Sequence, residues 1–435
     1  MSTSTSAPNG LEADVLHLAD GSTMASWTRR PLRRLLVRLL RGVGCGSLLV
    51  ELPNGERVLG RGAQPGPHAA VTLHRWRPLA RMVLRGDIGL AESYRDGDWS
   101  SPDLSALLEF GIRNEAGCGR AYEPSLPARW IGRVAHRLRS NTRRGSRQNI
   151  AFHYDLGNAF YAQWLDPQMI YSSALYARGD ETIEEAQATK LARIVELLEL
   201  QPGSTVLEIG CGWGALALAM GGEGGAQVTG LTLSTEQLAH ACEQVKAQGL
   251  EARIDLRLQD YRDVDGRYDR IVSIEMLEAV GERYWPVYFD TLRDRLADDG
   301  VAVVQVITID EAQFASYRAT PDFIQRFIFP GGMLPPVEAL RAQAARVGLR
   351  LEVAESFGMS YAATLAEWRR RFLAAWPTIE PLGFDAAFKR LWEYYLSYCE
   401  AGFRAGRVDV RLLRLSRMSK AADRLKGHGQ PTAAA

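Results

Sequence analysis

Apolar and polar positions alternate in a way that predicts an α/β domain over the second half of the chain. Apolar residues at helical spacing predict a helix over 183–200, which leads into a short apolar strand at Val206–Ile209. Strands and helices then follow in turn, with strands at 226–233, 253–258, 269–274, 300–308 and 350–357, and helices at 235–248, 284–297, 311–327, 363–375 and 383–406. This alternation predicts a doubly wound α/β sheet.

The first part of the chain has a different pattern. Residues 47–60 read as a hairpin whose turn is Asn54-Gly55, followed by a strand at 70–76 and a helix at 79–94. The sequence Ser101-Pro102-Asp103 precedes a further helix. These elements predict a separate, smaller α+β domain without a catalytic group of its own.

The segment Trp27–Val43 predicts a basic amphipathic helix. Its apolar face carries Leu32, Leu36, Leu39 and Val43, while the segment holds six arginines and no acid in 17 residues. One interpretation is attraction to anionic lipid headgroups. The other interpretation is burial of the leucine stripe inside the N-terminal domain. The two interpretations are compatible if the leucines face inward and the arginines face lipid.

Composition places the chain among globular proteins, with 46% hydrophobic and 24% charged residues in 435. The five cysteines are scattered and lack C-x-x-C spacing, which favours a reducing compartment and no structural zinc. No apolar run has the length of a signal peptide or a membrane span. Arginines gather at 124–149 without acids, and we interpret this stretch as a basic linker, because no nucleic-acid-binding module surrounds it.

The stretch Glu208–Gly214 has the spacing of a cofactor turn between a strand and a helix. Its glycines at 210, 212 and 214 allow the backbone to approach a ligand closely. A dinucleotide site has G-x-G-x-x-G and an acid at the end of the second strand, whereas this strand ends in Thr232, Leu233 and Ser234. E-x-G-x-G-x-G is instead the pattern of S-adenosylmethionine-dependent methyltransferases. The alternatives are a turn needed only for packing and a nicotinamide site.

Three further segments resemble the cyclopropane fatty acid synthase family. They are Gln148–Asn158 with Tyr171–Ala174, Phe327–Gly332, and Tyr394–Phe403. The resemblance implies a Rossmann-like class I methyltransferase domain at 148–425, with a helical insertion over the acyl pocket. It also implies an α+β lipid-binding domain at 1–125, a basic linker at 126–147 and a tail at 426–435.

The resemblance further implies the reaction. The cis double bond of an unsaturated phospholipid acyl chain takes the methyl group of S-adenosylmethionine, a carbocation forms, and bound bicarbonate removes a proton as a cyclopropane ring closes. The alternative is C-methylation that leaves a methyl-branched or methylene-bearing chain. We expect a cytoplasmic protein on the inner face of the membrane, with phospholipid as partner, no nucleic acid or metal, and a plausible homodimer.

Site residues follow from the same resemblance. Glu278 corresponds to the acid that orients bicarbonate and Tyr361 to the tyrosine that hydrogen-bonds it, with Glu275 the less favoured of the two acids. The residues that correspond to cofactor contacts are Tyr171, Ser172, Glu208, Gly210, Gly212, Gly214, Ser234, Gln237, Asp260 and Tyr261.

The chain departs from the family pattern at the anion site. Ser173 stands where the family has Cys, and Gln305 stands where it has His, while Ile307 matches. Ser173 is harmless if its backbone N–H makes the contact. Gln305 donates a hydrogen bond but cannot exchange a proton. Some branches of the family resemble this sequence in having Gln at this position and Glu-Met-x-Glu-Ala-Val-Gly nearby, so one alternative is that bicarbonate survives the change. If bicarbonate is lost, the resemblance implies a methylated or methylene-bearing product instead of a ring.

Overall fold

The computed structural model describes residues 14–17, 30–118 and 156–418. Two compact units divide the chain, one made of Met1–Val134 with Trp376–Ala405 and the other of Ala135–Ala375 with Gly406–Ala435. Each unit is considered by itself below. The basic linker at 126–147 and the first part of the motif at 148–158 lie outside the described residues.

The first unit holds a five-stranded sheet in the order β1-β3-β2-β4-β5. The predicted hairpin is present as two antiparallel strands, and its turn residue Gly55 has a φ of 81° that favours glycine. The sheet's strands are β1 (Asp14–His17), β2 (Cys45–Glu51), β3 (Arg57–Arg61), β4 (Gln64–Leu73) and β5 (Trp99–Ser100).

The helices of this unit come from both ends of the sequence. They are α1 (Arg30–Arg41), α2 (Arg77–Arg95), α3 (Leu104–Arg113), α4 (Glu115–Cys118), α17 (Trp376–Ile379), η5 (Glu380–Leu382) and α18 (Ala386–Arg404). The late helix α18 packs against α2 and α3, where Tyr94 donates to Glu393 at 2.9 Å and Ser105 donates to Glu400 at 2.6 Å. The boundaries expected from the sequence place α18 in the catalytic domain at 148–425, whereas the division into compact units places it in the first unit. The expected domain boundaries stay a prediction.

Helix α1 has the two faces that its sequence predicts. Leu36, Leu40 and Val43, just after the helix, are buried. Arg34 and Arg38 are exposed on the opposite face. The apolar stripe therefore packs into the unit, and attraction of the arginine face to lipid remains a prediction.

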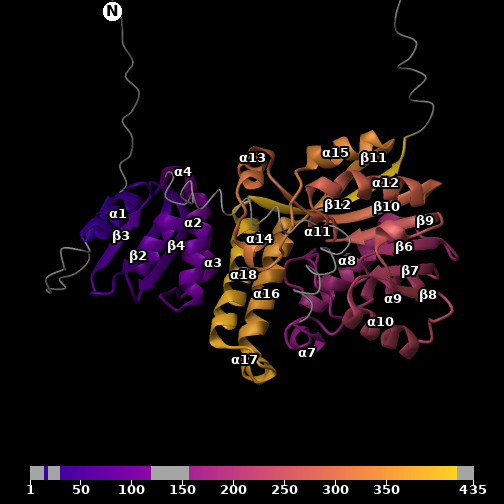
Figure 1. Cartoon of the computed structure of the whole chain (residues 1–435), viewed down its shortest axis with the longest axis horizontal. Coiled ribbons are helices and arrows are strands. Elements are labelled where there is room, and N and C mark those ends of the chain that lie inside the picture. The colour runs from indigo at the N-terminus through magenta and orange to yellow at the C-terminus, as the bar shows by residue number, and fades with distance from the viewer. Residues whose placement is uncertain (1–13, 18–29, 119–155, 419–435) are drawn as a thin grey trace, which may run out of the picture. The chain divides into compact units, whose positions relative to one another are not determined.

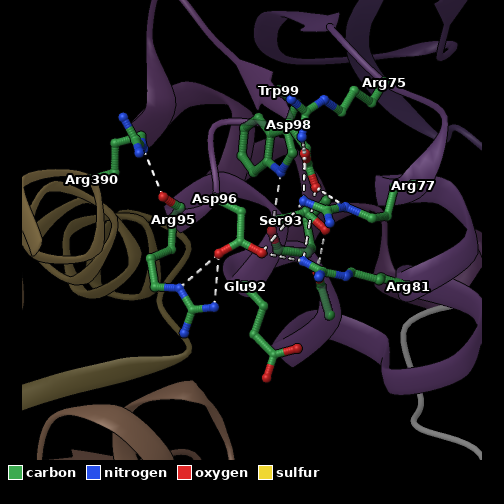
Figure 2. Close-up of polar contacts among 12 residues, drawn as sticks. Arg75, Arg77, Arg81, Glu92, Ser93, Arg95, Asp96, Asp98, Trp99 and Arg390 are labelled. Carbon is green, nitrogen blue, oxygen red and sulfur yellow. Dashed lines mark hydrogen bonds and ion pairs between the residues drawn. The ribbon is translucent and has the colours of Figure 1, made fainter. Parts of the chain in front are cut away.

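A buried carboxylate ties strand β5 to the start of α2 (Figure 2). The side chain of Asp98 is fully buried and accepts from Arg77 at 2.6 Å and from Arg75 at 3.2 Å. The neighbouring Asp96 pairs with Arg81 at 2.8 Å and with Arg95 at 2.8 Å. Because an unpaired buried charge is costly, these arginines are needed to keep Asp98 in place.

The second unit holds a seven-stranded sheet in the order β11-β12-β10-β9-β6-β7-β8 (Figure 1). Strands β6 to β10 pair in parallel, and β12 runs antiparallel between β10 and β11. The strands are β6 (Thr205–Ile209), β7 (Gln227–Thr232), β8 (Ile254–Leu258), β9 (Tyr268–Ile274), β10 (Leu296–Ile309), β11 (Leu349–Ser356) and β12 (Val408–Arg417). The sequence pattern had predicted every strand of this sheet except β12.

Helices cover this sheet and connect its strands. They are α7 (Asn158–Tyr161), α8 (Ile183–Leu198), α9 (Ala215–Gly221), α10 (Thr235–Ala247), η3 (Tyr261–Asp263), α11 (Leu277–Val280), η4 (Glu282–Tyr284), α12 (Trp285–Arg295), α13 (Glu311–Ala319), α14 (Phe323–Phe327), α15 (Val337–Arg346) and α16 (Gly358–Ala374). The single helix expected over 311–327 is two, because Asp322 starts α14 with a capping box. None of the helices in the described ranges is long and apolar enough to cross a lipid bilayer.

Parallel pairing brings the carboxyl ends of several strands to one edge of the sheet. In such sheets, ligands bind beyond these strand ends, on either side of the point where the strand order reverses. Here β6 lies between β7 and β9, so the turns that follow these three strands meet at that edge. The predicted cofactor and anion residues lie in or next to these turns.

Candidate active site

The glycine turn after β6 has the backbone geometry of a ligand cradle. Gly210, Gly212 and Gly214 all have positive φ angles, of 87°, 53° and 93°. A Cβ on Gly214 would lie 3.0 Å from the Cβ of Ala241, which is tighter than ordinary packing, whereas no atom lies within 4 Å of a Cβ built on Gly212. Glycine at 214 therefore serves close packing, and glycine at 212 leaves open space beside the turn.

Glu208, near the end of β6, is a buried acid with an unsatisfied oxygen. The residue is 2% exposed, its Oε2 has no hydrogen-bond partner within the described part of the chain, and burial raises the pKa of its carboxyl to about 8. Buried polar atoms in proteins are almost always paired. This orphaned oxygen beside an open glycine turn fits a ligand with hydroxyl groups, such as the ribose of S-adenosylmethionine.

The predicted contacts after β7 and β8 already hold local structure. Ser234 caps α10 by accepting from the backbone N–H of Gln237 at 3.3 Å, and Thr232 donates to the Gln237 side chain at 2.9 Å. Asp260 accepts from Arg262 in an ion pair of 2.5 Å and starts η3. These residues thus fix the turns that line the cofactor edge.

Tyr261 follows Asp260 and packs its ring against Tyr288, with 5.7 Å between the ring centroids. Burial raises the pKa of the Tyr261 hydroxyl, so this side chain stays neutral at physiological pH. It offers an apolar ring face at the end of β8.

Glu275 is the centre of the predicted anion site. Its Oε1 accepts from the backbone N–H of Ser173 at 2.9 Å and from the Gln305 side chain at 2.7 Å. Its Oε2 accepts from the hydroxyl of Tyr361 at 2.6 Å. Three residues that the sequence predicted around an anion therefore surround a carboxylate of the chain itself.

The backbone at Glu275 is held in an uncommon conformation. Its φ is 48°, in the left-handed region that non-glycine residues seldom adopt, and its N–H donates to the carbonyl of Gln305 at 2.8 Å. Such strain persists only where surrounding contacts enforce it, and it often accompanies function. Here it turns the carboxylate toward Ser173 and Tyr361.

Glu278, the acid that the sequence favoured, has different contacts. Its Oε1 accepts from the backbone N–H of Ile307 at 2.5 Å, and its Oε2 is buried without a partner. Burial and the nearby charge of Glu275 raise the pKa of Glu278 to about 8. Burial also raises the pKa of Glu275, but hydrogen bonds from Tyr361 and Ser173 and the charge of Lys190 oppose that shift. Glu275 is therefore the better candidate for a negative charge.

A buried lysine that the sequence did not single out lies close to this site. Lys190, on α8, donates to the Ser172 hydroxyl at 2.7 Å. Burial lowers the pKa of Lys190 to about 8, while the charges of Glu275 and Asp166 act to raise it. Lys190 thus remains mainly protonated at pH 7 and compensates the negative charge of Glu275.

One face of α16 fixes the loop that carries Ser173. The hydroxyl of Thr364 accepts from the backbone N–H of Ala174 at 3.1 Å, and that of Ser360 accepts from Tyr176 N–H at 3.1 Å. Tyr361 lies between them in sequence and reaches Glu275. The hydroxyl of Ser173 itself donates to the carbonyl of Ala174, so only its backbone faces the carboxylate.

Aromatic rings extend from the anion site to the glycine turn. The Trp368 ring lies 6.2 Å from that of Tyr361 and 5.2 Å from that of Tyr171, centroid to centroid. Tyr161 then lies 5.3 Å from Tyr171 and 5.2 Å from Trp213, in the turn. Such ring faces stabilise a nearby cation without offering a nucleophile.

A comparison with protein families decides the identity of the fold and the chemistry. Residues 141–413 match the model of the family described as mycolic acid cyclopropane synthetase. The chain belongs to this family. The resemblance inferred from its motifs is confirmed.

Curated relatives extend the match toward the N-terminus. The chain is 40% identical to the tuberculostearic acid methyltransferase UfaA1 of Mycobacterium tuberculosis, over 78% of this chain and 81% of the relative. It is 36% identical to the cyclopropane-fatty-acyl-phospholipid synthase of Escherichia coli K12, over 78% of this chain and 85% of the relative.

Solved structures of the family share the fold. The mycolic acid cyclopropane synthase CmaA1, in complex with SAH and CTAB, aligns with a TM-score of 0.58 and 31% identity, over 62% of this chain and 98% of that chain. The synthase MmaA2 from Mycobacterium tuberculosis aligns with a TM-score of 0.59 and 32% identity, over the same shares. The protein is an S-adenosylmethionine-dependent methyltransferase with a class I fold, as its sequence predicted.

Bicarbonate, the anion that the family resemblance implies, does not fit the geometry of this member. Ser173 N–H, Gln305 and Tyr361 all donate to Glu275, so the donors expected for bicarbonate are occupied. A further anion there would also face the carboxylate of Glu275 at close range. Ile307 lies two positions after Gln305 on β10. Its backbone N–H donates to Glu278, whereas the Gln305 side chain donates to Glu275.

Sequence analysis ranked Glu275 below Glu278 because motif similarity favours the acid that the family shares. The signal for Glu275 was a second carboxylate at the end of a buried strand, three positions earlier. Lys190 gave no comparable signal, because a lysine inside a helix pattern is normally exposed.

Proposed function

We propose that this family member transfers a methyl group from S-adenosylmethionine to the cis double bond of an unsaturated phospholipid acyl chain and leaves a methylene-bearing chain. The observation that supports this product is the Glu275 carboxylate at the centre of the predicted anion site. The family resemblance ties ring closure to a bound bicarbonate, which this site does not accommodate. The 40% identity to a tuberculostearic acid methyltransferase points in the same direction.

The residues that would hold the cofactor are those of the glycine turn. Glu208 has a free oxygen for ribose hydroxyls, and the backbone at Gly212 leaves room for the ligand. When bound, S-adenosylmethionine supplies an electrophilic methyl group. The rings of Tyr171, Trp368 and Tyr361 form a water-poor wall that favours a positive charge on the acyl chain.

The proposed product follows from the fate of that charge. After the alkene carbon takes the methyl group, the cation lies on the neighbouring carbon. A hydride shift moves it to the methyl-bearing carbon, and loss of a methyl proton then forms an exocyclic double bond.

A cyclopropane ring is the second candidate product. It is favoured by the 36% identity to the Escherichia coli cyclopropane-fatty-acyl-phospholipid synthase and by the presence of Glu278, Tyr361 and Ile307 at the matching positions. Ring closure requires loss of the methyl proton before the hydride shift. The two products are isomers, so their mass does not separate them.

Proton NMR of the product decides between them. Purified enzyme, S-adenosylmethionine and vesicles of monounsaturated phosphatidylglycerol are incubated, and the acyl chains are analysed. We expect vinylic signals of an exocyclic methylene group. Upfield ring protons would instead establish the cyclopropane product, and unchanged acyl chains would refute the proposed activity.

We further propose that the first unit binds the surface of an anionic membrane. Val83 is 46% exposed and Leu84 is 60% exposed, on α2 next to its kink at Gly86. Arg81 and Arg85, which flank this pair in sequence, are engaged by Asp96 and Glu92, whereas α1 presents the exposed Arg34 and Arg38 on a separate face. An exposed apolar pair together with a face of exposed arginines suits a bilayer with acidic headgroups, where the apolar groups insert and the cations contact phosphate.

A further inference from the structure

We infer that Glu275 is the general base of this enzyme and replaces the bicarbonate of its relatives. This inference rests on the proposed transfer to an alkene, but it holds for either product. The carboxylate lies where the sequence predicts an anion, and the chain itself supplies that anion. With Glu275 as the base, Ser173, Gln305 and Tyr361 position its side chain and do not bind bicarbonate.

The hydrogen bonds around Glu275 leave one position for a proton. Each carboxylate oxygen accepts about two hydrogen bonds. Oε1 accepts from Ser173 and Gln305 and is saturated, whereas among the residues that the structure describes Oε2 accepts only from Tyr361. The second lone pair of Oε2 is therefore the site that can receive a proton from the substrate.

Hydrogen bonds and a nearby cation stabilise the ionised form of Glu275 against its burial. Burial raises the pKa of Glu275, while the donors Tyr361 and Ser173 and the charge of Lys190 on α8 act to lower it, and Asp166 interacts electrostatically with the same lysine. Glu278 on α11 is mainly neutral at pH 7, because burial and Glu275 raise its pKa to about 8. Of these two acids, Glu275 is thus the one whose negative charge the surrounding donors and the lysine stabilise.

The proposed step balances without another reactant. A C–H bond of the transferred methyl group breaks, its proton goes to Oε2 of Glu275, and its electron pair forms the exocyclic C=C bond or, in the ring product, a C–C bond. The cation is neutralised as the carboxylate becomes a carboxylic acid. The acid returns its proton to solvent before the next turnover, so no oxidant, metal or bicarbonate is consumed.

Removing bicarbonate from the wild-type enzyme tests this inference without any substitution. Turnover is measured in degassed, carbonate-free buffer and again with added sodium bicarbonate. We expect the two rates to agree within twofold. If turnover collapses without bicarbonate and returns when it is added, the inference is overturned, although the proposed function then still stands.

Two substitutions test the carboxylate itself. Glu275→Gln keeps the size of the side chain but removes its basicity, so we expect turnover to fall by about 10²-fold or more. Glu275→Gly removes the side chain and frees the three donors, so added bicarbonate or formate should restore part of the lost rate. The control Glu282→Gln, which removes an acid paired with Arg318 at the surface, should leave the rate unchanged.

Anion binding gives a readout that does not depend on turnover. Carbon-13 NMR of labelled bicarbonate should show no binding to the wild type and saturable binding to Glu275→Gly, with calorimetric binding of S-adenosylhomocysteine as the check on folding. Saturable bicarbonate binding to the wild type, competing at this site, would overturn the inference. So would a Glu275→Gln enzyme with the wild-type rate.

If the wild type yields no lipid product in either buffer, the proposed function fails, and the binding experiment still decides whether Glu275 fills the anion site.

Discussion

Two partly buried acids at the active site both have raised pKa values but differ in their surroundings. Glu275 has three hydrogen-bond donors and a nearby lysine, whereas Glu278 has one backbone donor and the repulsion of Glu275. Environments that separate the pKa values of neighbouring acids commonly mark distinct catalytic roles. Here they favour the negative charge on Glu275 and the proton on Glu278.

The raised pKa of Glu278 predicts a pH dependence of stability. The folded pKa is about 8 and the unfolded value is about 4.5, so the folded state holds the proton more tightly between these limits. The free energy of unfolding should therefore fall as pH rises through this range. In Glu278→Gln the fall should be smaller, by on the order of 3 kcal/mol in total. Urea unfolding at pH 5 and pH 8 measures it, and an unchanged slope would show that Glu278 is ionised in the folded state.

The orphaned oxygen of Glu208 predicts a loss of cofactor affinity. Glu208→Gln replaces a hydroxyl acceptor by an amide of equal size, so we expect the Kd for S-adenosylmethionine to rise by about 10-fold to 100-fold. Titration calorimetry measures this change. The control Glu236→Gln alters an exposed acid on the first turn of α10 and should leave the Kd unchanged. An unaltered Kd in Glu208→Gln would mean that this acid does not contact the cofactor.

At the level of elements, α16 carries the side chains that hold the active-site loop. Thr364→Val should leave the buried N–H of Ala174 unpaired, at a cost of about 1–3 kcal/mol in the free energy of unfolding. Thr291→Val removes only a bond within its own helix and should change stability by less than about 0.5 kcal/mol. Urea denaturation compares them, and equal effects would argue against a positioning role for Thr364.

The elements that sequence analysis missed had weak local signals. Helix α16 begins at Gly358 without a side-chain cap, so its first turn, which holds Tyr361, fell outside the expected helix at 363–375. Strand β12 has three arginines among its residues and follows a long helix, which hid its alternation. Its place in the middle of the sheet depends on pairing with β10 and β11, which are distant in sequence.

The parallel strands and the glycine turn, by contrast, could be predicted from sequence because their signals are local. The short apolar runs of β6, β7 and β9 are typical of buried strands. The motif Glu208–Gly214 indicates that the turn after β6 binds S-adenosylmethionine. The contacts of Glu275 could not be predicted, because they join residues up to 102 positions apart. A motif identifies which residues matter, but only the fold shows which of two neighbouring acids they surround.

For the whole molecule, the proposed membrane surface predicts a salt-dependent interaction with lipid. The wild type should sediment with phosphatidylglycerol vesicles and release as salt rises, because screened charge supplies part of the binding. Leu84→Asp should weaken binding about 10-fold by removing an inserted apolar group and adding a charge. Leu258→Asp alters a residue of the second unit that is 48% exposed and should bind like the wild type. Equal loss in both variants would contradict the assignment of the surface to α2.

The ion pairs of Asp98 predict where the first unit is most easily destabilised. Asp98→Asn leaves Arg77 without its buried partner and should lower the free energy of unfolding by about 3 kcal/mol (Figure 2). Because vesicle binding needs a folded unit, binding should fall along with stability. Unchanged stability in Asp98→Asn would contradict this prediction, because Asp98 is fully buried and its effect on binding can only pass through the fold.

The most direct test of the central claim is the fate of deuterium from methyl-deuterated S-adenosylmethionine. The enzyme is incubated with monounsaturated phosphatidylglycerol in carbonate-free buffer, and the acyl chains are analysed by mass spectrometry. Our account predicts that the added carbon retains two of its three deuterium atoms, because Glu275 removes one from the transferred methyl group. Retention of all three, or absence of label from the acyl chain, would contradict it.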